Sequence, residues 1–198
     1  MEYPDEQTIN VLLVALLTRV ARRDEVALAE LYDSTANRVY ALALRISGDR
    51  QAAEEIVSDV YFQIWNQVSR YDPTRGRVLA WILMVCRSRA LDQRRRRDLA
   101  DPHPDPSALR PDLVTDDNDP LDLLVVIERD SAVGRALACL DARERSLLSM
   151  AFFGGLTHQE IAKQTGMPLG SIKSILRRSL LTMRPLLEQA NVSVKEST

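Results

Sequence analysis

The chain has 198 residues, a formal net charge of −2 and a hydrophobic fraction of 45%. These values are typical of one ordinary domain or two small ones, and they exclude an intrinsically disordered chain. Only seven glycines, with abundant Ala, Leu and Arg, favour an all-helical fold.

Helical periodicity begins at about residue 8 and continues to 97. The apolar run from Val11 to Leu17 is too short to span a bilayer. Acidic residues precede this run and no small-residue cleavage site follows it, so the run is not predicted to be a signal peptide. We therefore expect a cytoplasmic protein without direct membrane insertion.

The next predicted elements are amphipathic helices. A pair of amphipathic stretches is marked by Leu28, Leu31, Tyr32, Tyr40 and Leu44. Gly48 and Asp49 break the pattern, and it resumes over 52–68. In that second segment the apolar residues recur at intervals of four, which predicts one buried helical face. These residues are Ile56, Val60, Ile64 and Val68.

A basic loop and a basic helix come next. Pro73 and Gly76 predict a loop between Tyr71 and Arg77, and a helix follows from Leu79 to Arg97. The core face of this helix is predicted to hold Leu79, Ile82, Leu83, Cys86 and Ala90. The opposite face would present an exposed Trp81 with Ser88, Asp92 and Arg95. An exposed aromatic beside polar and cationic groups suits stacking on unpaired bases, although a solvated charged face gives the same composition.

Charge is strongly segregated along the chain. Segment 70–97 holds nine arginines and two aspartates, 9 − 2 = +7. Segment 98–130 holds ten acidic residues and two arginines, 2 − 10 = −8. Residues 98–120 also contain five prolines and no apolar period, so we expect an extended, flexible acidic linker between two helical domains.

The last part of the chain, 121–198, is predicted to form a second helical domain with a helix-turn-helix. Thr157 and Glu160 have the spacing of a capping box, and the residues from Gly166 to Pro168 predict a tight turn. A second helix would start at about Gly170, and Pro185 would end or kink it. Its buried stripe is predicted to be Ile172, Leu176, Leu180 and Met183.

Cys86 and Cys139 are the only cysteines. Both lie inside apolar helical patterns, so we expect two buried thiols.

Together these segments resemble the extracytoplasmic-function (ECF) group of bacterial RNA polymerase sigma factors. The resemblance is carried by ALAELYDSTANRVYALALRISGD, AAEEIVSDVYFQIW and YDPTRGRVLAWILMVCRSRALDQRRRR in that order, followed by the helix-turn-helix. It implies a region-two domain over 1–97 that binds core polymerase and the promoter −10 element. It also implies a region-four domain over 121–198 that binds the −35 element. Such a protein has no catalytic site and needs no cofactor or metal.

The resemblance implies a polymerase-binding helix over 54–67 that docks on the coiled coil of the β′ subunit. Its contact residues would be Glu55, Ser58, Asp59 and Phe62, at helix spacings that place them on one side. The sequence leaves open whether Phe62 and Trp65 face that partner or pack in the core.

The resemblance also implies the DNA contacts. Those to the −10 element would be Tyr71, Arg75, Arg77, Trp81, Ser88, Asp92, Arg95 and Arg96. Those to the −35 element would be Thr157, His158, Ser171, Lys173, Ser174, Arg177 and Arg178. Family members commonly carry asparagine at the position of Ser88 and a basic residue at that of Ile175, so the promoter sequence that this chain prefers stays open.

The implied partners are core RNA polymerase, through its β′ coiled coil and β flap, promoter DNA, and an anti-sigma factor that is often membrane-bound in this family. In the family the linker threads toward the RNA exit path, where its acidic residues could imitate nucleic acid. A simple solubilising tether explains those residues equally well.

Two other functional hypotheses account for parts of the same sequence. A stand-alone regulator would need the helix-turn-helix but not the basic helix that begins near Trp81. A nuclease could use Glu54, Glu55 and Asp59, yet no histidine or second acidic cluster accompanies them. His158 is disfavoured as a metal ligand because the only other histidine, His103, lies in the predicted linker.

Overall fold

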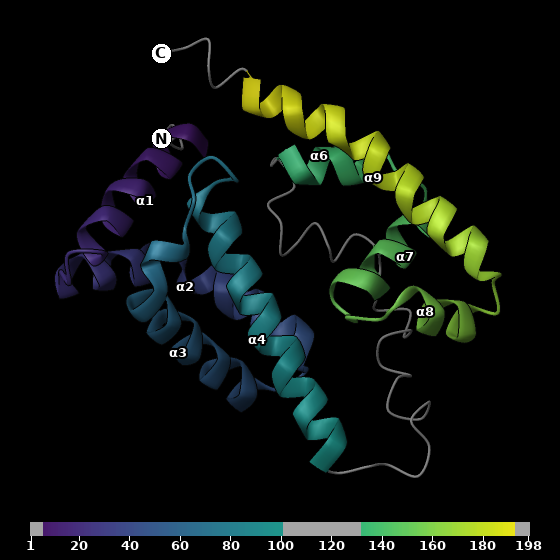
Figure 1. Cartoon of the computed structure of the whole chain (residues 1–198), viewed down its shortest axis with the longest axis horizontal. Coiled ribbons are helices and arrows are strands. Elements are labelled where there is room, and N and C mark those ends of the chain that lie inside the picture. Colours follow the sequence, from purple (N-terminus) through teal and green to yellow (C-terminus); the bar gives the residue numbers. More distant parts are fainter. Residues whose placement is uncertain (1–5, 101–131, 193–198) are drawn as a thin grey trace. The chain divides into compact units, whose positions relative to one another are not determined.

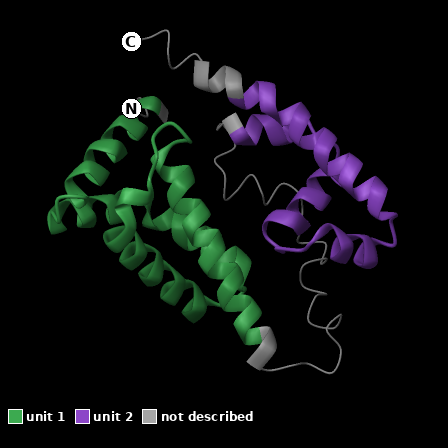
Figure 2. Ribbon diagram, in the orientation of Figure 1, with its two compact units in different colours: residues 1–100 green, residues 101–198 purple. Residues whose placement is uncertain are grey.

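The structure, a computed structural model, describes residues 6–100 and 132–192. Every regular element in these two ranges is a helix, which confirms the predicted all-helical fold class. The chain divides into two compact units, Met1–Ala100 and Asp101–Thr198 (Figure 2). No helix within the described ranges is long and apolar enough to cross a membrane.

The first unit is a helical bundle arranged around one long helix (Figure 1). Its elements are α1 (Glu6–Val20), α2 (Glu25–Ser47), α3 (Arg50–Gln67), the short 3-10 helix η1 (Val68–Arg70) and α4 (Val78–Ala100). Helix α2 contacts α1, α3 and α4 and so forms the centre of the bundle. The pair of amphipathic stretches predicted after residue 28 is therefore one continuous helix.

The predicted break at Gly48 and Asp49 is confirmed, and its chemistry is local. Gly48 ends α2 in the left-handed region, with φ of 68°, which glycine adopts without steric cost. Asp49 then begins α3 by accepting a hydrogen bond from the Ala52 N–H at 2.7 Å. Two adjacent residues thus end one helix and start the next.

The core of the first unit follows the predicted stripes in part, because Val68, Leu79 and Leu83 are only half-buried and Val68 begins η1. Ile56, Val60 and Ile64 of α3 are buried, as are Ile82 and Cys86 of α4. Burial raises the pKa of the Cys86 thiol to about 12, so this thiol stays protonated and unreactive at neutral pH.

One polar pair lies inside this core. The hydroxyl groups of Thr35 and Tyr61 are 2.7 Å apart, and the Thr35 hydroxyl also donates to the Leu31 carbonyl. Burial raises the pKa of Tyr61 to about 12. Because both hydroxyl groups have partners, the pair can be buried without an unsatisfied polar atom.

The second unit is also arranged around one long helix, its last. Its described elements are α6 (Ala132–Ala138), α7 (Ala142–Phe152), α8 (His158–Thr165) and α9 (Leu169–Val192). Helix α9 contacts α6, α7 and α8. The core between α7, α8 and α9 consists of Leu147, Leu156, Ile161, Ile172 and Leu176.

The predicted buried stripe of α9 was wrong at one position. Leu180 is 58% exposed, whereas Ser179 is fully buried. The Ser179 hydroxyl donates to the Ile175 carbonyl at 3.0 Å, so its burial leaves no unpaired donor. The helices packed against α9 cover the side that includes Ser179, and this side could not be inferred from spacing alone.

Three other expectations need correction. Cys139 is exposed, because it follows the last residue of α6 instead of lying within a packed helix. Helix α4 continues past the predicted end at Arg97 to Ala100. Pro185 lies inside α9, which continues to Val192, so this exposed proline does not end the helix. The rest of the predicted linker lies outside the described residues.

Candidate nucleic-acid interface

The predicted helix-turn-helix is formed by α8 and α9. The Thr157 hydroxyl accepts from the Glu160 N–H at 3.3 Å, and the Glu160 carboxylate accepts from the Thr157 N–H at 2.8 Å. This confirms the capping box at the start of α8. Gly166 has φ of 69° and ends α8, which allows the chain to turn into α9.

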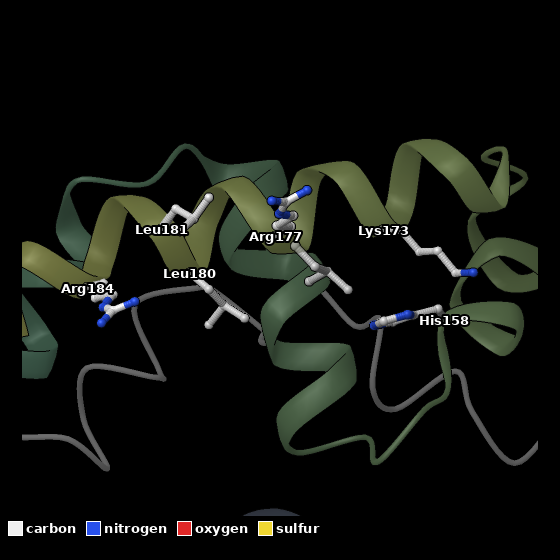
Figure 3. A pocket seen from close by; sticks show the side chains of 7 residues that line it. His158, Lys173, Arg177, Leu180, Leu181 and Arg184 are labelled. Atoms are coloured by element: carbon white, nitrogen blue, oxygen red, sulfur yellow. The ribbon is translucent and has the colours of Figure 1, made fainter.

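The outer surface of this motif carries all seven predicted −35 residues, and each of them is exposed. One side of α9 borders a hollow of about 410 Å³, lined by His158, Lys173, Arg177 and Arg184 together with leucines. In Figure 3 the Lys173 side chain extends from α9 toward His158, which begins α8. The structure therefore brings residues from both helices of the motif to one surface.

The other side of α9 borders a second hollow, of about 560 Å³, lined by Ser171, Ser174, Arg178 and Arg143. Arg143 belongs to α7 and donates to the Met167 sulfur at 3.1 Å. The sequence analysis did not identify Arg143 or Arg184 as site residues. Periodicity does not reveal that the start of α7 lies beside the turn of the motif.

The charge of this surface suits nucleic acid. Among the described residues that line the two hollows there are five arginine or lysine side chains and no carboxylate. Arg and Lys side chains bind phosphate oxygens and guanine edges, and serine hydroxyl groups bond to either.

In the first unit, the loop from Tyr71 to Arg77 is held by its own hydrogen bonds. The Asp72 carboxylate accepts from the Thr74 N–H at 2.9 Å and from the Thr74 hydroxyl at 2.7 Å. These bonds from Thr74 lower the pKa of Asp72. The Tyr71 hydroxyl donates to the Gly76 carbonyl at 3.0 Å, which closes the loop at its base.

Two aromatic rings meet where this loop joins α4. The ring centroids of Tyr71 and Trp81 are 5.6 Å apart and the rings are tilted by 56°. Both side chains are half-buried, so the expectation of an exposed Trp81 was wrong. Trp81 is partly covered because its ring packs against Tyr71. The part of the Trp81 ring that stays exposed forms an aromatic surface whose position is held by Tyr71.

The outward face of α4 follows the prediction beyond Trp81. Ser88, Asp92, Arg95 and Arg96 are exposed, as is Arg75 of the loop, whereas Arg77 is half-buried. Partial burial, with the nearby charge of Arg95, lowers the pKa of Arg87. The loop and α4 thus form one surface that is aromatic at its start and cationic at its end.

The predicted polymerase-binding residues Glu55, Ser58, Asp59 and Phe62 are all exposed on α3. Phe62 is 71% exposed, so it does not pack in the core. Trp65 is half-buried, and the Arg23 guanidinium lies 5.1 Å from its ring centroid. Glu55 accepts a hydrogen bond from Gln93 of α4 at 3.0 Å. Within the described ranges, no three His, Cys, Asp or Glu side chains lie together as metal ligands.

A helical bundle with an aromatic and basic face, in one chain with a basic helix-turn-helix, has the surfaces expected of a DNA-binding protein. Two family models match the chain: Sigma-70 region 2 over residues 31–99 and Sigma-70, region 4 over residues 136–184. The chain belongs to the ECF group of RNA polymerase sigma factors, as the following relatives also show.

The chain is 36% identical over 174 residues to the ECF RNA polymerase sigma factor RpoE of Cereibacter sphaeroides, covering 86% of this chain and 92% of that protein. It is 32% identical over 184 residues to the ECF sigma factor SigK of Mycobacterium tuberculosis, covering 89% and 94%. Among solved structures, it is similar to Rhodobacter sphaeroides SigE in complex with the anti-sigma ChrR. That match has 34% identity, a TM-score of 0.48, and covers 86% and 98% of the two chains.

Proposed function

We propose that the two units of this sigma factor divide the recognition of a promoter between them. Helix α9 reads the −35 element in the major groove through Lys173, Ser174, Arg177 and Arg178. Thr157 and His158 at the start of α8, with Ser171, contact the adjacent backbone. The exposure and the cationic character of this surface support the assignment.

The loop from Tyr71 to Arg77 and α4 open and hold the −10 element. Trp81, supported by Tyr71, stacks on a base of the unpaired strand, and Ser88 and Asp92 bond to base edges. Arg75, Arg77, Arg95 and Arg96 hold phosphates. Unstacking a base costs a few kcal/mol, and stacking on an aromatic ring offsets about 1–3 kcal/mol of it.

The single observation that carries this proposal is the Tyr71 and Trp81 ring pair at the head of a basic helix. A regulator that binds only duplex DNA through a helix-turn-helix has no use for an aromatic platform beside cations. A protein that separates strands needs both groups, because unpaired bases stack and their phosphates attract cations.

Helix α3 docks on the β′ coiled coil of core polymerase through Glu55, Ser58, Asp59 and Phe62, and the second unit lies near the β flap. The protein acts in the cytoplasm as a specificity subunit, and nucleotide addition belongs to the core enzyme.

An anti-sigma factor holds the sigma factor inactive by covering these surfaces. The exposed apolar side chains of Phe62, Leu180 and Leu181 fit such a partner.

In vitro transcription with purified core polymerase tests the proposal. The wild-type protein should direct initiation from a cognate promoter, and permanganate should detect unpaired thymines around the −10 element. The free protein should bind the same promoter only weakly, because each unit alone makes a small contact. Failure to bind core, or a symmetric footprint without polymerase, contradicts the proposal.

A further inference from the structure

Helix α4 begins without the usual capping residue. The Arg77 carbonyl accepts from the Trp81 N–H at 3.1 Å, so Arg77 occupies the N-cap position. Ser, Thr, Asp and Asn are preferred there because their side-chain oxygens accept hydrogen bonds from the first turn. A guanidinium has donors only, and its positive charge opposes the helix dipole at this end. Arg77 therefore cannot satisfy the first N–H groups of α4.

A residue distant in sequence accepts one of these N–H groups instead. The Asn10 side-chain oxygen, on α1, accepts from the Val78 N–H at 3.0 Å. Val78 is fully buried, so its N–H would have no ready partner if Asn10 were lost.

The position of Asn10 in α1 is unusual for a polar residue. The buried face of α1 consists of Leu13, Leu17 and Val20. Asn10 lies one turn before Leu13, on the same face and half-buried. An amide at a position suited to an apolar side chain indicates a specific hydrogen-bonding role.

We propose that Asn10 is a positioning residue for promoter opening, an inference that rests on the assignment of the loop and α4 to the −10 element. By holding the Val78 N–H, it fixes the first turn of α4 and with it the direction of Trp81. It also anchors the end of the loop whose base is closed by the Tyr71 hydroxyl. This role lies in α1, which precedes the residues matched by the region 2 family model.

Asn10→Leu and Asn10→Asp test this role. Leucine has a similar size but cannot accept, whereas aspartate keeps an acceptor in the same place. In complex with core polymerase, Asn10→Leu should open a duplex promoter about fivefold less, as measured by permanganate reactivity, consistent with loss of one hydrogen bond. On a template unpaired in advance the loss should stay under about twofold, since the unstacking cost is already met. Asn10→Asp should open both templates as the wild type does.

Val20→Ala is the matched control, because it weakens the packing of α1 at its last residue and leaves the hydrogen bond between Asn10 and Val78 in place. It should lower stability but leave promoter opening and core affinity unchanged. In the free protein, amide hydrogen exchange at Val78 should be faster in Asn10→Leu than in Asn10→Asp or Val20→Ala. Equal opening by Asn10→Leu and wild type, or an equal defect in Val20→Ala, overturns the inference. If the wild type itself opens no promoter, the proposed function fails instead.

Discussion

At the scale of single residues, exposure separates the side chains that support the fold from those that support a partner. Tyr61 and Phe62 are neighbours in α3, yet Tyr61 is buried with its hydroxyl paired, whereas Phe62 is 71% exposed. A solvent-facing phenyl ring contributes little to folding, and aromatic residues dominate the energetics of protein interfaces. Phe62 is therefore the most informative residue at which to probe the proposed polymerase contact.

Phe62→Ser should weaken binding to core polymerase by about 2 kcal/mol, or about thirtyfold, as expected for an aromatic residue at the centre of an interface. The free energy of unfolding should change little. Fluorescence anisotropy with labelled protein measures the affinity, and urea unfolding measures the stability.

Val11→Ser provides the matched control, because Val11 is 62% exposed and lies on α1, outside the proposed contact surface of α3. It should bind core as the wild type does. Equal affinities of Phe62→Ser and the wild type would remove Phe62 from the polymerase contact.

At the scale of single elements, short capping motifs position the helices of the second unit. Asp141 with Glu144 begins α7, and Thr157 with Glu160 begins α8, each as a complete capping box. Helices α7 and α8 are short, and each capping box determines the residue at which its helix starts. In α8 this position also places His158 beside Lys173 of α9.

Thr157→Ala should destabilise the second unit by about 1 kcal/mol, because it removes the acceptor for the Glu160 N–H. Urea unfolding of the free protein, followed by circular dichroism, measures the change. Thr157→Ser keeps the hydroxyl and should lose less than half as much.

Gln159→Ala is a suitable control for this measurement, since Gln159 is exposed in the same helix. Its stability should match that of the wild type. A loss in Thr157→Ser as large as that in Thr157→Ala would show that the hydroxyl does not cap α8.

At the scale of the whole molecule, net charge is a poor guide to the partner. The formal net charge is −2, close to neutral, and would not suggest a nucleic-acid-binding protein. The positive charge is instead concentrated at the end of α4 and on the outer face of α9. Phosphate binding depends on such local surfaces, because charges beyond about 10 Å are screened at ordinary salt.

Arg95→Gln combined with Arg96→Gln should reduce the salt dependence of promoter binding by the polymerase complex. Each phosphate contact contributes about 0.7 to 0.9 to the slope of log affinity against log salt, so the double variant should lower that slope by about 1.5. Filter binding over a series of KCl concentrations measures it.

Arg22→Gln removes a charge at an exposed position that belongs to neither α4 nor α9, and it should leave the slope unchanged. Equal slopes for the Arg95 and Arg96 double variant and the wild type would contradict the proposed phosphate contacts.

The sequence by itself determined the helical fold class, the break at Gly48 and Asp49, the capping box at Thr157 and the outward face of α4 after Trp81. These features depend on periodicity, capping and turn residues, whose effects act within one helix or turn. The same local signals predicted the exposed side of α3, and the buried side of α9 except at Leu180.

Only the tertiary structure decided which side of each helix is covered, and by which neighbour. Ser179 is buried in place of Leu180, Trp81 packs on Tyr71, and Asn10 bonds to Val78 across 68 positions of sequence. In each case the residue's partner, or the helix that buries the residue, belongs to another part of the unit. Local spacing carries no information on the angle at which two helices meet, and that angle determines these contacts.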